Sequence, residues 1–140
     1  MRFFGATFDP SGLYRLNAVM RWLADQNVDF AHIHAHVKKL QSRFLDAIGL
    51  SPLRGLALER LVPPVGSPRG NFLTFALPWA VEVEAALSDR HIRVDRRRDR
   101  LRLGFGLYHD EAFIDELVLR LRSALRALPL GPARESSPSP

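Results

Sequence analysis

Apolar residues recur at helical spacing in three stretches of the chain, which predict helices over about 12–26, 29–48 and 110–128. In each stretch an apolar side chain returns every three or four residues, so one side of the helix is apolar and the other is polar. The three stripes consist of Leu13, Leu16, Met20, Leu23 and Ala24; of Ile33, Val37, Leu40, Phe44 and Ile48; and of Phe113, Ile114, Leu117, Val118, Leu121, Leu125 and Leu128. The third stripe is the longest, and we expect it to pack against the core.

Residues that favour helix ends flank these stretches. Ser11, Asp29 and Asp110 each precede an apolar stripe, and their side-chain oxygens are suited to accept a hydrogen bond from a free N–H of the first turn. We expect Gly49 to follow the end of the second helix and Pro52 to prevent its continuation.

The middle of the chain carries the patterns typical of β-strands. Residues 71–77 (NFLTFAL) predict a buried strand, and 91–95 with 100–105 predict a hairpin around a charged turn. We also expect a short strand near 56–61 and a helix over 78–88 with Pro78 at its first position. The second hairpin strand divides its side chains between two faces, with Leu101, Leu103 and Phe105 on one and Arg100, Arg102 and Gly104 on the other.

The order of these elements predicts an α+β fold. Two long helices come first, and then a strand, a helix, two strands and a final helix, so that helices cover one face of a small, largely antiparallel sheet. Along the chain this gives a linking helix at 28–50, a small domain at 51–129 and a disordered tail at 130–140, which is rich in Ser and Pro.

The composition excludes several classes of site. The 140-residue sequence has no cysteine, which excludes disulfides, Cys-ligated zinc, iron–sulfur clusters and a cysteine nucleophile. No apolar run approaches the ~20 residues of a membrane span, so we expect no membrane association. The first residues lack the apolar region of a signal peptide, and we expect a cytoplasmic location.

The positive charge is concentrated in the predicted hairpin. The chain has 20 Lys and Arg against 15 Asp and Glu. The stretch from Asp89 to Arg102 contains most of this excess, which makes it the candidate for nucleic-acid binding. It has no aromatic residue for base stacking, and Asp95 and Asp99 lower its positive potential. We therefore favour a solvated turn over nucleic-acid binding at this hairpin.

Histidines at 32, 34 and 36 raise the question of a metal site. On a helix His32 and His36 share one side while His34 lies far around it, and no cysteine supplies a third ligand. We favour solvated or partly packed histidines, and we assign no metal ligand.

Three segments together resemble the C-terminal third of class V aminotransferases, the fold-type I family of pyridoxal-phosphate (PLP) enzymes that includes kynureninase. Residues 2–22 (RFFGATFDPSGLYRLNAVMRWL) are similar to the family's "RF-x-G-G-T" segment and the helix after it. Residues 69–75 (RGNFLTF) are similar to the opening strand of its small domain. Residues 92–117 resemble its "V-x-x-D-x-R … L-R" hairpin and terminal helix, with a kynureninase-like character.

The resemblance implies a PLP cofactor and assigns roles to two residues. Thr7 matches a threonine that reaches the cofactor phosphate of the neighbouring subunit, although Ala6 replaces the family's second glycine. Arg102 matches the arginine that holds the substrate α-carboxylate, and a guanidinium fork suits such bidentate binding. The alternatives are a turn-capping hydroxyl for Thr7 and an exposed strand arginine for Arg102.

The resemblance also implies what this chain lacks. The family's cofactor lysine, its pyridine-pairing aspartate and its ring-stacking residue precede the matching region, so 1–27 correspond to a remnant of the large-domain end. We therefore expect the C-terminal portion of a PLP enzyme, inactive alone, which acts on an amino acid when a large domain is supplied and which forms a homo-oligomer or pairs with a large-domain chain. The alternatives are a non-catalytic module that binds a partner through its first helix, or a nucleic-acid binder.

Overall fold

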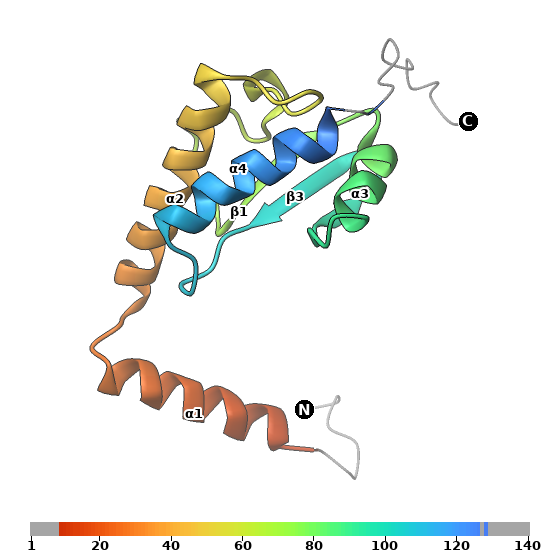
Figure 1. Cartoon of the computed structure of the whole chain (residues 1–140). Coiled ribbons are helices and arrows are strands. Elements are labelled where there is room, and N and C mark those ends of the chain that lie inside the picture. The colour runs from red at the N-terminus through yellow and green to blue at the C-terminus, as the bar shows by residue number, and fades with distance from the viewer. Residues whose placement is uncertain (1–8, 127, 129–140) are drawn as a thin grey trace. The chain divides into compact units, whose positions relative to one another are not determined.

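The computed structural model describes residues 9–126 and 128 of the chain, and these residues divide between two compact units, 1–33 and 34–140 (Figure 1). In order along the chain the elements are α1 (Ser11–Asp25), α2 (Phe30–Leu50), a short 3-10 helix (Leu58–Arg60), β1 (Phe72–Ala76), α3 (Ala80–Ser88), β2 (Asp95–Arg97), β3 (Arg100–Gly104) and α4 (Glu111–Leu125). The chain is therefore a mixed α and β protein with a small sheet, as predicted. Thr7 and the predicted tail at 130–140 lie outside the described residues.

In the first unit, α1 begins one residue earlier than predicted. Ser11 is its first residue rather than its cap, and the Asp9 carboxylate accepts a hydrogen bond from the Ser11 N–H at 2.9 Å. The helix ends where Asn27 takes a positive φ of 55°, and the Val28 N–H then donates to the Leu23 carbonyl at 2.9 Å. None of the α1 side chains is buried.

The predicted cap of α2 is confirmed, but its predicted end is wrong. Asp29 Oδ1 accepts a hydrogen bond from the His32 N–H at 2.7 Å. The helix continues through Gly49 to Leu50, because the Ser51 N–H still donates to the Ala47 carbonyl at 3.2 Å.

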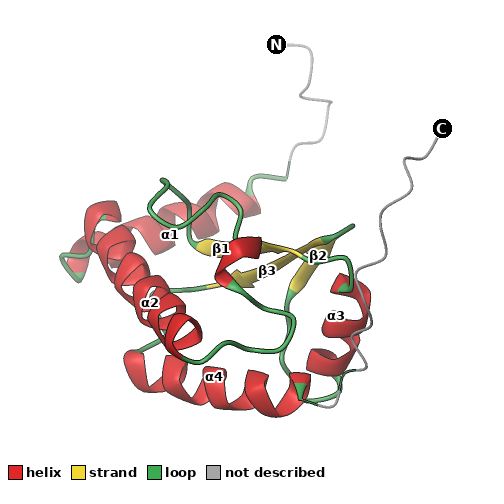
Figure 2. Cartoon of the chain, turned by 90° about the horizontal axis from the view of Figure 1, so that it is seen from above, coloured by secondary structure: helices red, strands yellow, loops and turns green. Residues whose placement is uncertain are grey.

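In the second unit, three antiparallel strands form a sheet in the order β1-β3-β2 (Figures 1 and 2). Leu73 lies opposite Leu103 and Phe75 opposite Leu101, so these four side chains share the face on which α4 lies. Residues 61 and 62 follow the outer edge of β1, where the Val62 N–H donates to the Thr74 carbonyl at 2.8 Å.

The predicted hairpin is confirmed, but its first strand begins four residues later than predicted. β2 starts at Asp95 because the preceding residues form the turn that ends α3 instead of joining the sheet. His91 has a positive φ of 56°, and the Ile92 N–H donates to the Leu87 carbonyl at 2.9 Å. This closure leaves 92–94 outside any strand.

Two other predictions between 50 and 80 are wrong. The expected strand at 56–61 is a 3-10 helix followed by a single bridge from Leu61 to Phe75. Pro78 precedes α3 rather than beginning it, because the Leu77 N–H still bonds to the Asp99 carbonyl at 2.7 Å and keeps the chain beside the hairpin.

The core lies between the sheet and the helices α2, α3 and α4. Its largest fully buried side chains are Phe44, Phe75, Leu40, Ile48, Leu56, Leu73, Leu77, Leu87, Leu101, Ile114, Leu121 and Leu125. Phe44 of α2 meets Phe105 edge to face, with 5.9 Å between ring centroids. In the predicted α4 stripe, Phe113 and Leu117 are only half-buried, and Ala124 is buried instead. No helix in the described ranges is both long and apolar enough to cross a bilayer.

Candidate functional site: Arg102 and the pocket beside α4

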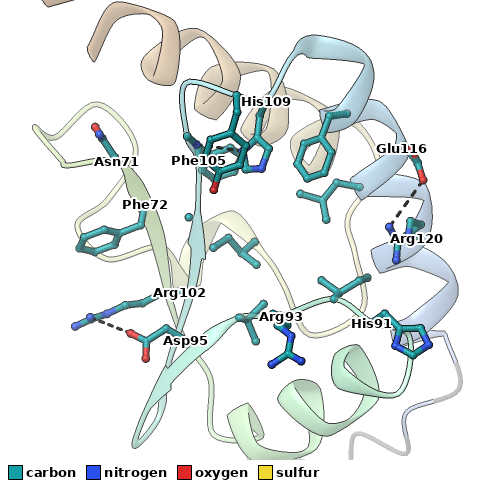
Figure 3. A pocket seen from close by; sticks show the side chains of 18 residues that line it. Asn71, Phe72, His91, Arg93, Asp95, Arg102, Phe105, His109, Glu116 and Arg120 are labelled. Atoms are coloured by element: carbon teal, nitrogen blue, oxygen red, sulfur yellow. Dashed lines mark hydrogen bonds and ion pairs between the residues drawn. The ribbon is translucent and has the colours of Figure 1, made fainter. Parts of the chain in front are cut away.

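Arg102 lies in the middle of β3 and projects from the sheet face opposite α4 (Figure 3). Strand alternation places it there, because its neighbours Leu101 and Leu103 are buried beneath α4. The register pairs Arg102 with Asp95 of β2, and its Nη1 donates to Asp95 Oδ2 at 3.1 Å. The guanidinium carbon lies 5.2 Å from the centre of the Phe72 ring, a cation–π contact.

The Arg102 guanidinium retains hydrogen-bonding capacity. Its Nε is buried and has no partner among the described residues, and its side chain is 30% exposed. A carboxylate that approaches this face would meet a planar donor group already oriented by an aromatic ring. The site that the resemblance predicts for substrate is thus chemically suited to bind a carboxylate.

A pocket of about 630 Å³ lies on the other side of β3, between residues 91–95, the end of β3 and α4. Its volume falls in the range of small-molecule sites. Its apolar lining includes Ile92, Leu103, Phe105, Phe113 and Leu117. Arg102 and Asp95 also line this pocket, and Figure 3 shows their side chains on the side of β3 away from α4.

His109 closes one end of this pocket and is held from three sides. Its Nδ1 accepts a hydrogen bond from the Gly106 N–H at 3.1 Å, and its ring stacks on Phe113 with 4.1 Å between centroids. His36 Nε2 donates to the His109 carbonyl at 2.8 Å, which ties this turn to α2. Burial lowers the pKa of His109, nearby His36 lowers it further, and Asp110 opposes both. The turn therefore favours a neutral His109.

Gly106 lies directly beneath the exposed ring of Tyr108. A Cβ at position 106 would lie 2.5 Å from a ring carbon of Tyr108. Any other residue would force the Tyr108 ring to move.

Acidic side chains partly neutralise the basic hairpin. Asp95 pairs with Arg102 at 3.1 Å and Asp99 with Arg100 at 3.5 Å. Arg96 reaches across to Glu84 of α3 at 2.5 Å. These pairs lower the positive potential that would attract a nucleic-acid backbone.

The histidines at positions 32, 34 and 36 do not come together to form one site. His32 bonds to Asp29 through its Nδ1 at 2.8 Å, His34 is exposed, and His36 contacts the 106–109 turn. In the part of the chain that the structure describes, no three His, Cys, Asp or Glu residues are placed to hold a metal ion.

The two lysines are exposed on α2. Lys39 pairs with Glu111 of α4 at 2.5 Å and Lys38 points to solvent. Beside them, Arg43 makes a bidentate contact with Asp115, with Nη2 at 2.6 Å from Oδ2, and holds the pKa of that carboxyl below its usual value.

The sequence singles out Arg102 as a candidate, but it does not predict the contacts around this region. The Asp95–Arg102 pair follows from hairpin register, and a correct placement of β2 would have found it. The His36–His109 contact joins residues 73 positions apart and has no local signal.

A scan against protein-family models and searches of curated proteins and of solved structures found no match to this chain.

Proposed function

We infer that this chain provides the carboxylate-binding small domain of a PLP-dependent enzyme of the class V aminotransferase or kynureninase-like kind, with an amino acid as substrate. The proposed enzyme also needs a lysine-bearing large domain, which the described residues do not form. Arg102 binds the substrate α-carboxylate, and Thr7 contacts the cofactor phosphate.

The observation that carries the proposal is the placement of Arg102. It lies on the sheet face away from α4, against the Phe72 ring, and its side chain is 30% exposed beside its ion-pair partner Asp95. A second domain seated on this face would exclude water, which would strengthen an arginine–carboxylate interaction.

The described residues do not fit the cofactor itself. PLP enzymes of this type bind the cofactor through a lysine amine, and such an amine is activated in a desolvated site. Lys38 and Lys39 are both exposed, on a helix surface. The role proposed for this chain is therefore substrate binding, and no chemical step is assigned to it.

The experiment that tests this proposal supplies a large domain. The chain is co-expressed with a class V aminotransferase large domain from which the native small domain has been deleted, and amino-acid turnover is measured. We expect the two polypeptides to co-purify and turnover to require both. Arg102→Gln should raise KM by about tenfold or more, because a charge-assisted bidentate contact contributes roughly 1.5–3 kcal/mol.

Arg100→Gln is the matched control, because Arg100 lies on the same strand face as Arg102. Arg100 pairs with Asp99, whereas Arg102 pairs with Asp95 and contacts the Phe72 ring. Failure of the two polypeptides to associate, or equal effects of the two substitutions, would contradict the proposal.

A second candidate function rests on α1. Its apolar side chains include Leu13 at 54% and Leu16 at 56% exposure, more than a soluble helix usually leaves uncovered. This favours a module that binds a partner through α1, and it is compatible with a large domain as that partner.

A further inference from the structure

The pocket beside α4 reaches a free edge of β3. β2 pairs only with residues 100–102, so the next stretch of β3 on this side faces the pocket border instead of another strand. Gly104 lies there, is exposed, and has nothing within 4 Å of the position that a Cβ would take. The edge is therefore open to a ligand.

The Gly104 N–H points to this open edge. The Phe105 N–H donates to the Asn71 carbonyl at 2.9 Å, which is on the β1 side. Because successive N–H groups of a strand point to opposite edges, the Gly104 N–H points away from β1. It donates to none of the described residues. The pocket border thus contains a fixed, unpaired backbone donor.

The charged groups around the pocket leave one positive charge unbalanced. Asp95 pairs with Arg102 at 3.1 Å, and Glu116 lies 3.8 Å from Arg120. Arg93, which also borders the pocket, forms no ion pair with any residue that the structure describes. Figure 3 places Arg93 and His91 at the end of the pocket away from His109.

The lining of the pocket is suited to the apolar part of a ligand. Ile92, Leu103 and Phe105 are nearly fully buried beneath it, while Phe113 and Leu117 present half-exposed side chains from α4. A ligand that covered these two half-exposed side chains would remove apolar surface from water, and this burial would favour binding.

We propose that this pocket binds a small organic anion with an apolar, ring-sized body. The Gly104 N–H donates to the anionic group, the charge of Arg93 attracts this group at longer range, and the apolar part of the ligand packs against Phe113 and Leu117. The groups invoked here are Arg93, Gly104, Phe113 and Leu117, none of which the PLP proposal uses, so the inference does not depend on that proposal.

The test is a titration of the isotope-labelled full chain with naphthoate, monitored by amide NMR shifts. Naphthamide, which has the same ring system and no charge, is titrated in parallel. We expect saturable shifts at Gly104 and along 113–117, with naphthoate binding at least tenfold more tightly than naphthamide. Arg93→Glu should weaken naphthoate binding by tenfold or more and leave naphthamide binding unchanged.

Arg97→Glu is the matched control, because Arg97 is an exposed arginine of β2 that does not border the pocket. Equal weakening by both substitutions would show general charge attraction and would overturn the proposal. So would equal affinity for the two ligands, or an absence of saturable shifts at Gly104. Leu117→Trp, which fills the pocket, should abolish the shifts of both ligands. Retention of these shifts in a folded Leu117→Trp variant would place the ligands elsewhere and also overturn the proposal.

Discussion

Leu117 and Leu121 lie one turn apart on α4, but they have different surroundings. Leu121 is fully buried, whereas Leu117 is half-buried at the pocket wall. The cost of removing a leucine side chain depends on the cavity that it leaves, and a site open to water leaves none. The same substitution should therefore have different effects at these two positions.

Leu121→Ala should lower the free energy of unfolding by about 2–5 kcal/mol, measured by urea denaturation. Leu117→Ala should cost clearly less than this. Leu119→Ala serves as the control, because Leu119 is 66% exposed and surface substitutions usually change stability by less than about 0.5 kcal/mol. Equal losses at 117 and 121 would contradict the burial described for α4.

His109 should make stability depend on pH in a narrow window. Its pKa is lowered in the folded chain from the usual value of 6.5, chiefly by burial. Below about pH 6.5 the unfolded chain therefore binds a proton that the folded chain resists, and stability should fall as the pH decreases from about 7 to 5. His109→Gln should remove this part of the dependence, as measured by thermal unfolding at each pH.

The carboxylates act in a different pH range. The pKa values of Asp29, Glu111 and Asp115 are lowered from 3.8 or 4.5, mainly by hydrogen bonds to His32, Lys39 and Arg43 respectively. Their stabilising contribution is present above these values and is lost only at more acidic pH. If the loss between pH 7 and 5 persisted in His109→Gln, another group would be responsible.

At the scale of elements, local signals predicted the helices well. The caps Asp29 and Asp110 act within three residues, and Asp110 accepts a hydrogen bond from the Phe113 N–H at 2.7 Å, as predicted. The start of β2 was missed because it depends on how α3 closes, through His91 in a left-handed conformation that few residues other than glycine adopt. The face of Arg102 followed from strand alternation alone, whereas its buried Nε and its contact with Phe72 depend on side-chain packing that no pattern encodes.

α1 should cause the chain to self-associate when no partner is present. Its exposed apolar side chains include Leu13, Leu16 and Met20, and covering them removes apolar surface from water. We expect the average mass in sedimentation equilibrium to rise with concentration, and Leu16→Glu to suppress the rise.

Arg15→Glu is the control for a change of charge on the same helix, because Arg15 is exposed and outside the apolar stripe. A strictly monomeric chain in which α1 is strongly protected from hydrogen exchange would mean that α1 is covered by the chain itself.

At the scale of the whole molecule, the chain alone should not be an active PLP enzyme. Lys38 and Lys39 are its two lysines, and both are exposed on α2. Neither amine lies in a desolvated site that would activate it, so we expect no single favoured Schiff base. After incubation with PLP and reduction with borohydride, mass spectrometry should find low-level labelling spread over both lysines and the N-terminal amine. A stoichiometric adduct at one lysine, together with amino-acid turnover, would disprove the prediction.

The shortness of β2 also bears on how the chain avoids aggregation. An exposed edge strand is a template on which other chains can add strands, and long, flat, apolar edges are the most hazardous. Here the outer edge of the sheet on the β2 side has only three strand residues, Asp95–Arg97, and all three are charged. The opposite edge, at β1, is bordered by residues 61 and 62. Neither edge offers a foreign strand a long uncharged row of free backbone groups, so crowding in the cell should not readily convert this small sheet into a fibril seed.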